Sequence, residues 1–240
     1  MKGILYGVGI GPGDPELMTV KARRILAETR VLAVPAGKNG EKGTARTIVE
    51  AGVDCTGKRL LELPFSMRDG EDGWRAEGAR AGELLLPYLE AGETVAMAVL
   101  GDVTVYSTFL YVQSYVREKG FETCMGPGIS AYSACAAQAG IGLLAGQESL
   151  AVLTGERLRQ MADGEAGTLP GQWDTAVLMK AGGQGAALRA SLEAAGLSGE
   201  EAWAFSNIGM EGAYAGPLET ERTYGYFTTV IARRRKERQA

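Results

Sequence analysis

The feature that most constrains the fold is a glycine-rich loop that follows an apolar run at the start of the chain. Residues 4–6 (Ile-Leu-Tyr) are apolar, and glycines then stand at every second position: Gly7, Gly9, Gly11 and Gly13. Glycine permits backbone conformations and close approaches that a Cβ forbids, and Pro12 stiffens the loop. We expect a helix to begin at residues 17–19, so the pattern is strand, rigid loop, helix, which is typical of a parallel α/β sheet.

The loop does not match the dinucleotide-binding fingerprint. G-x-G-x-x-G counted from Gly7 needs glycine where Pro12 stands, and counted from Gly9 it needs glycine where Asp14 stands. The second expected strand, residues 31–35, also lacks the terminal acid that would hold a ribose. A common methyltransferase variant has an acid two residues before the first glycine, where this chain has Leu5. The loop is therefore of a different kind.

Two further glycine-containing motifs follow later apolar runs. The sequence LGDVTVYSTF, residues 100–109, comes after the run 94–99, and MGPGISA, residues 125–131, comes after the next short run. In parallel sheets, ligands bind beyond the carboxyl ends of the strands. Three motifs at three strand ends therefore predict one ligand site.

The alternation of apolar runs and helical periodicity predicts two domains. We expect an α/β domain over residues 1–140, with a parallel sheet covered by helices. We expect a second α+β domain with a mixed sheet over residues 141–240, because the regular alternation of strand and helix patterns ends at Gly140. The expected strands are 3–8, 30–34, 59–63, 94–99, 121–125, 150–154, 175–179, 201–206 and 226–232, with a solvated basic tail over 233–236.

Composition excludes several classes of function. The 240 residues contain no histidine, so Ser-His-Asp and Cys-His catalysis and histidine-ligated metals are ruled out. A net charge of −4 argues against a nucleic-acid partner. The three cysteines show no C-x-x-C spacing, which predicts reduced thiols and no metal site. With no apolar stretch of membrane-spanning length and no room for a signal peptide, we expect a cytoplasmic protein without a membrane partner.

The three motifs in this order, GxGxGPGDPxLxT, LGDxTxYSTF and GPGISAxSA, closely resemble the tetrapyrrole methylase family. The resemblance spans nearly the whole chain. Members use S-adenosylmethionine, whose methyl group is already activated, so transfer needs no histidine. YSTF and PGISAYSACAA look most like the branch that methylates C-20 of precorrin-2 or cobalt-factor II in corrinoid (cobalamin) biosynthesis.

The resemblance also implies site residues and partners. The second domain would close a cofactor cleft, the substrate's meso carbon would be the nucleophile, and the protein would be a homodimer. Asp102 and Tyr106 are the candidates for a base that removes the displaced proton. The cofactor-binding residues carried over are Pro12, Leu100, Gly101, Asp102, Val105, Ser130, Ala131, Met179, Asn207, Ile208 and Thr229.

Structural roles compete with these assignments. Gly101-Asp102 is also a common turn, Ser130 is a good helix N-cap, and methionine at Met179 is more often core than ligand contact. Lys180 could bind an anionic substrate, or it could be a solvent-exposed side chain with no binding role. Basic loop residues that suit substrate carboxylates are Lys38, Lys42, Arg46, Arg68 and Arg75.

Two alternative functions stay open at this point. The chain could belong to another branch of the family, such as the uroporphyrinogen methylases, or it could be a tetrapyrrole-binding module without catalytic activity. Within the favoured branch, the residues do not choose between a metal-free and a cobalt-containing substrate.

Overall fold

A computed structural model describes residues 2–37, 41–65, 70–164, 173–199 and 201–234, and it divides into two compact units, Met1–Ser130 and Ala131–Ala240. The first unit holds a sheet of five parallel strands in the order β3-β2-β4-β1-β5. These strands are β1 (Ile4–Gly9), β2 (Val31–Pro35), β3 (Arg59–Leu63), β4 (Val95–Val99) and β5 (Glu122–Gly126). The expected parallel α/β sheet is confirmed, with each strand within about two residues of its predicted bounds.

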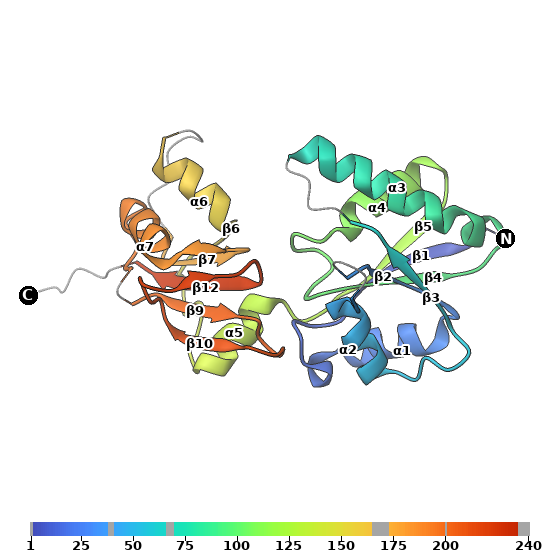
Figure 1. The fold of residues 1–240 in the computed structure, drawn as a ribbon, viewed down its shortest axis with the longest axis horizontal. Helices are drawn as coiled ribbons and strands as arrows, with labels where there is room; N and C mark the ends of the chain where they lie inside the picture. The colour runs from blue at the N-terminus through green and yellow to red at the C-terminus, as the bar shows by residue number, and fades with distance from the viewer. Residues whose placement is uncertain (1, 38–40, 66–69, 165–172, 200, 235–240) are drawn as a thin grey trace, which may run out of the picture. The chain divides into compact units, whose positions relative to one another are not determined.

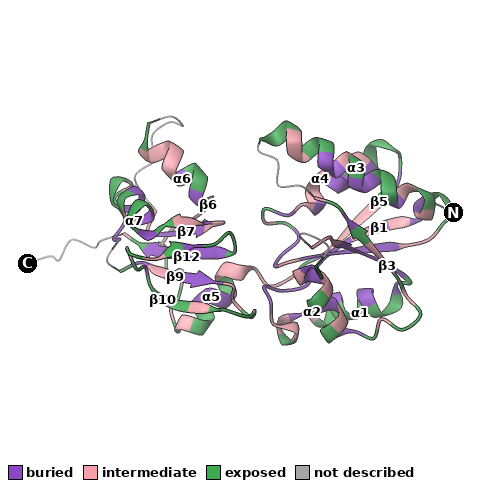
Figure 2. Cartoon of the chain, in the orientation of Figure 1, coloured by how far each residue is buried: buried purple, intermediate pink, exposed green. Residues whose placement is uncertain are grey.

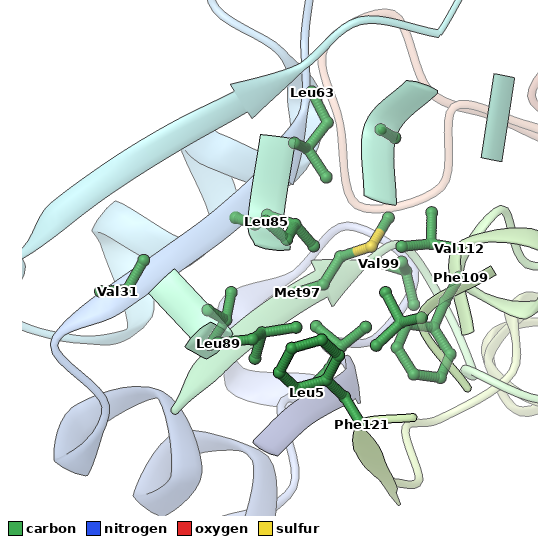
Figure 3. Close-up of a cluster of buried hydrophobic side chains, with 14 of the residues drawn as sticks. Leu5, Val31, Leu63, Leu85, Leu89, Met97, Val99, Phe109, Val112 and Phe121 are labelled. Atoms are coloured by element: carbon green, nitrogen blue, oxygen red, sulfur yellow. The ribbon is translucent and has the colours of Figure 1, made fainter. Parts of the chain in front are cut away.

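Helices cover both faces of this sheet (Figure 1). Helices α1 (Val20–Glu28) and α2 (Thr44–Gly52) lie on one face, and α3 (Glu71–Glu90) and α4 (Phe109–Glu118) lie on the other. Alternate residues of each strand point to opposite faces, so Met97 packs under α3 and α4 (Figure 3) while Ala96 packs under α1 and α2. A short 3₁₀-helix, η1 (Pro15–Leu17), joins the first loop to α1.

The order of the strands creates a topological switch point between β1 and β4. From β1 the chain runs through α1 to β2 on one side, whereas from β4 it runs through α4 to β5 on the other. Because β1 and β4 are neighbours, the chain runs on from their carboxyl ends toward opposite edges of the sheet. Open α/β sheets bind ligands at such points.

The second unit contains a mixed five-stranded sheet in the order β10-β9-β12-β7-β6. Strands β6 (Leu150–Thr154) and β7 (Thr175–Met179) are parallel, and β9 (Trp203–Ser206), β10 (Tyr214–Pro217) and β12 (Thr228–Arg233) pair antiparallel. Two short strands, β8 (Gly183–Gln184) and β11 (Thr223–Tyr224), form a separate pair. The expected mixed sheet is confirmed.

Helices also cover both faces of the second sheet. Helices α6 (Gly155–Ala162) and α7 (Gly185–Ala194) bury Leu158 and Leu188 on one face, and α5 (Ala131–Ala139) buries Cys135 on the other. The prediction divided the chain after residue 140, at the end of α5. In the structure α5 packs on β12 and β10, so it groups with the second unit. Figure 2 shows buried strands in both sheets and exposed outer helix faces.

The basic C-terminal segment only partly fits the expected solvated tail. Arg233 is exposed and ends β12, but the Arg234 backbone N–H donates to the Asp174 carbonyl at 2.8 Å and its Nε donates to the Trp173 carbonyl at 2.9 Å. Residues 235 and 236 lie outside the described part. No helix of the described ranges is long and apolar enough to cross a membrane, and Cys55, Cys124 and Cys135 are free thiols.

Candidate functional site

The loops that follow β1 and β4 are held together by their backbones. The Gly101 N–H donates to the Gly11 carbonyl at 2.7 Å, and the Gly11 N–H donates to the Gly101 carbonyl at 3.2 Å. Both residues have the left-handed backbone that favours glycine, with φ of 80° at Gly11 and 73° at Gly101. This bridge lies at the switch point, so two of the three motifs meet where a ligand site is expected.

The loop after β5 packs against the same bridge. A Cβ on Gly128 would collide with the Gly101 carbonyl oxygen and come within 2.7 Å of the Gly9 carbonyl carbon. A Cβ on Gly9 would lie 2.6 Å from the Gly128 nitrogen. Backbone therefore contacts backbone at the meeting of all three motifs. These glycines are required by the packing of one loop on another, which is the structural role that competed with ligand contact.

Asp102 ties the second motif to the third. One carboxylate oxygen, Oδ2, accepts the Gly128 N–H at 2.8 Å, and the other, Oδ1, accepts the Thr104 N–H at 2.9 Å and the Thr104 hydroxyl. The side chain is buried, at 8 % exposure. Burial alone would raise the pKa of the carboxyl group, but the hydrogen bonds from Thr104, Gly128 and Val103 hold this pKa below its usual value. Asp102 is therefore an ionised clamp between two loops.

The other predicted residues of the first unit surround this clamp. Pro12 is buried, Leu100 and Val105 are half-buried, and Tyr106 is 42 % exposed. Burial raises the pKa of the Tyr106 phenol, so it stays protonated at neutral pH. The lowered pKa of Asp102 makes its carboxylate a weak base, and the Tyr106 phenol stays protonated, so the structure favours neither as the proton acceptor.

In the second unit, four predicted residues lie on the face of the sheet that α5 covers. Met179 and Ile208 pack against the cluster formed by Cys135, Val177, Phe205 and Ile231. Thr229 is buried and hydrogen-bonds the Cys135 thiol, while burial raises the pKa of that thiol to about 12. Ala131 begins α5 on this same face, and Ser130, half-buried, precedes it at the end of the first unit.

Three residues carry a strained backbone that the sequence did not reveal. Among the described residues, the non-glycine residues with positive φ are Tyr106 at 48°, Lys180 at 52° and Asn207 at 50°. Lys180 directly follows β7, Asn207 directly follows β9, and Tyr106 lies in the loop after β4. Left-handed backbone costs roughly 1–2 kcal/mol for a residue with a Cβ and gathers at functional sites. Each of the three is a predicted site residue or adjoins one.

The basic residues expected to meet substrate carboxylates are engaged with the chain's own acids. Lys42 and Arg46 pair with Glu50, and Arg46 also reaches Glu62 at 3.0 Å. Arg75 pairs with Glu71 at 2.8 Å. Lys38 and Arg68 lie outside the described residues.

These surroundings fit S-adenosylmethionine better than a nucleotide. The cofactor has no phosphate, and the motif glycines pack on one another rather than forming an open phosphate cradle. Within the first unit, half-buried Leu100 and Val105 also present apolar surface, which suits an uncharged ring better than a phosphate.

The chain is similar to known tetrapyrrole-modifying proteins. The model of the tetrapyrrole (corrin/porphyrin) methylases matches residues 4–220. A probable cobalt-precorrin-2 C(20)-methyltransferase of Methanocaldococcus jannaschii is 37% identical over 73% of this chain and 71% of its own length. A precorrin-2 C(20)-methyltransferase of a Sinorhizobium species is 35% identical over 81% of this chain and 80% of its own. The crystal structure of uroporphyrin-III C-methyl transferase from Thermus thermophilus, complexed with S-adenyl homocysteine, superposes with a TM-score of 0.66 at 19% identity, covering 96% of this chain and 92% of that one.

Proposed function

This chain belongs to the tetrapyrrole (corrin/porphyrin) methylase family, and we propose that it transfers a methyl group from S-adenosylmethionine to C-20 of precorrin-2 or its cobalt form in cobalamin biosynthesis. The observation that carries this proposal is the similarity, over most of the chain, to two relatives that bear this activity in their names. The residues quoted for the branch, YSTF and PGISAYSACAA, point the same way.

The reaction requires little acid–base chemistry from the protein. The cofactor supplies an activated methyl group; a ring carbon of the substrate forms a bond to it, and the carbon–sulfur bond breaks to leave a neutral thioether. The proton on that ring carbon is then lost to water or to a base. The chain therefore contributes orientation and exclusion of water, which fits a site built of packed loops without histidine.

The residues proposed to contact the cofactor are those of the two sets described above. In the first unit they are Pro12, Leu100, Gly101, Asp102, Val105 and Ser130, and in the second Ala131, Met179, Asn207, Ile208 and Thr229. Asp102 acts on the cofactor chiefly through the loop that it holds in place, because both of its oxygens already accept hydrogen bonds. Substituting one set at a time, with S-adenosylhomocysteine affinity as the measurement, tests each assignment.

We also propose that the protein works in the cytoplasm as a homodimer, without nucleic acid. Its three thiols are unpaired, which suits a reducing compartment, and its net charge is negative. The proposal of a dimer rests on the family resemblance alone. Light scattering of the purified protein tests it by measuring the molar mass in solution.

The test of the proposed activity is anaerobic incubation of the protein with S-adenosylmethionine and one tetrapyrrole at a time. The substrates are precorrin-2, its cobalt form and uroporphyrinogen III, and mass spectrometry reads the product. A product one methyl group heavier from either of the first two supports the proposal. Methylation of uroporphyrinogen III instead moves the chain to another branch, and tight binding without turnover indicates a binding module.

A further inference from the structure

Two aromatic side chains stand exposed at the turn before β12. Tyr226 is 38 % exposed and Phe227 is 45 % exposed, although the next two residues, Thr228 and Thr229, are buried. The two rings make an edge-on contact with their centroids 5.3 Å apart. Large apolar side chains gathered at one point of a surface commonly mark a binding site.

A cation lies beside this aromatic pair. The Lys180 ammonium is 5.6 Å from the centroid of the Tyr226 ring. Lys180 has a left-handed backbone, and the turn around it is fixed because the next residue, Ala181, is buried and donates its N–H to the Thr228 carbonyl at 2.9 Å. Glycine or asparagine would adopt this conformation at lower cost, so the lysine side chain is placed against the local backbone preference.

The predicted cofactor residues of the second unit adjoin the same point. The Asn207 N–H donates to the Phe227 carbonyl at 2.9 Å, Met179 precedes Lys180, and Thr229 follows the aromatic turn by two residues. The ends of β7 and β9 and the start of β12 therefore bring a cation and two exposed rings to the edge of the proposed cofactor-binding set.

We propose that Lys180, Tyr226 and Phe227 form a substrate-binding platform that receives the tetrapyrrole of the proposed reaction. The Lys180 ammonium pairs with one peripheral carboxylate, and the two rings contact the apolar part of the macrocycle. This inference rests on the proposed function, and it adds the residues that select an anionic, ring-shaped substrate.

The chemistry of the platform fits this ligand. Early corrinoid precursors carry acetate and propionate groups around a large unsaturated ring, so they offer anions and an apolar surface together. A cation beside aromatic faces binds such a molecule through a charge-assisted hydrogen bond and ring contact.

The experiment measures the KM for the tetrapyrrole, kcat and the dissociation constant of S-adenosylhomocysteine in four variants. Lys180→Gln removes the charge, Lys180→Arg keeps it, and Tyr226→Ser with Phe227→Ser removes both rings. Lys119→Gln is the matched control, because its ammonium lies 5.1 Å above the Tyr115 ring in the first unit. The substrate is whichever of precorrin-2 and its cobalt form the unaltered protein methylates.

We expect Lys180→Gln and the double serine variant each to raise the KM about tenfold, as the loss of one charged hydrogen bond or of ring contact does. The arginine variant stays within about threefold of the unaltered protein, since the charge remains. Cofactor affinity and kcat stay unchanged, the control behaves as the unaltered protein, and added salt raises the KM of Lys180→Gln less than that of the parent.

Other results overturn the inference in distinguishable ways. Unchanged KM in both the glutamine and the serine variants, with methylation intact, refutes the platform and leaves the proposed function standing. A parallel loss of S-adenosylhomocysteine affinity assigns these residues to the cofactor. If the unaltered protein methylates no tetrapyrrole, the proposed function fails and the platform fails with it.

Discussion

Replacing Asp102 by asparagine tests whether this residue is a clamp between loops. In Asp102→Asn the remaining oxygen can still accept from Thr104, but the amide NH₂ then faces the Gly128 N–H, donor against donor. The protein loses one charge-assisted hydrogen bond and leaves a part-buried N–H without an acceptor. Such a loss costs about 1.5–3 kcal/mol, which lowers Tm by roughly 6 °C in a chain of this size.

Asp54 provides the matched control. Its carboxylate accepts the Thr56 N–H at 2.9 Å in the same two-residue turn, but the side chain is exposed and reaches no second loop. Asp54→Asn should therefore change stability by no more than about 0.5 kcal/mol. Urea unfolding at pH 7.5, followed by circular dichroism, compares the two variants with the parent.

The pH dependence gives a second measurement of the same clamp. Because the folded pKa of Asp102 lies below its unfolded value, the carboxylate contributes stability above the unfolded pKa of about 3.9 and loses it as the pH falls through the folded pKa. The difference in stability between the parent and Asp102→Asn should shrink in that acid range. Equal stability of the Asp102 and Asp54 variants at pH 7.5 would refute the clamp.

Three further predictions follow from particular contacts. Gly128→Ala should lower Tm by several degrees through collision with the Gly101 carbonyl, at about 1–3 kcal/mol, and a thermal scan showing no change contradicts the close packing of the loops. Iodoacetamide at pH 8 should label Cys124 well before Cys135, whose buried thiol has a pKa of about 12; equal labelling by peptide mass spectrometry would count against this burial. Asn207→Val should destabilise the fold by about 1–2 kcal/mol while Asn207→Gly does not, because a β-branched residue resists a φ of 50°; equal denaturation midpoints would exclude that strain.

Much of the fold could be predicted from local pattern. In a chain that alternates strands and helices, a short apolar run between polar turns predicts a strand. Residues 59–63 have this pattern, and they form β3. The short strands β8, β10 and β11 were missed. Strand β10 contains Gly216 and Pro217, which sequence rules treat as turn residues, and it is stabilised by its pairing with β9.

The meeting of the three loops could be predicted from the sequence, but the contacts between them could not. Glycines at strand ends indicated where the loops meet, yet the sequence could not show that Gly9, Gly101 and Gly128 pack on one another. The hydrogen bond from Gly128 to Asp102 joins residues 26 positions apart, so no local spacing reveals it. The left-handed backbones of Lys180 and Asn207 were likewise hidden, because neither residue type demands that conformation.

The position of the transferred methyl group tests the central claim most directly. The protein is incubated anaerobically with S-adenosylmethionine bearing a carbon-13 methyl group and with precorrin-2 or its cobalt form, the ring carbons of which are also labelled. We expect one new methyl signal in the NMR spectrum, coupled to carbon 20. A methyl signal coupled to any other ring carbon, or no label on either tetrapyrrole, would contradict it.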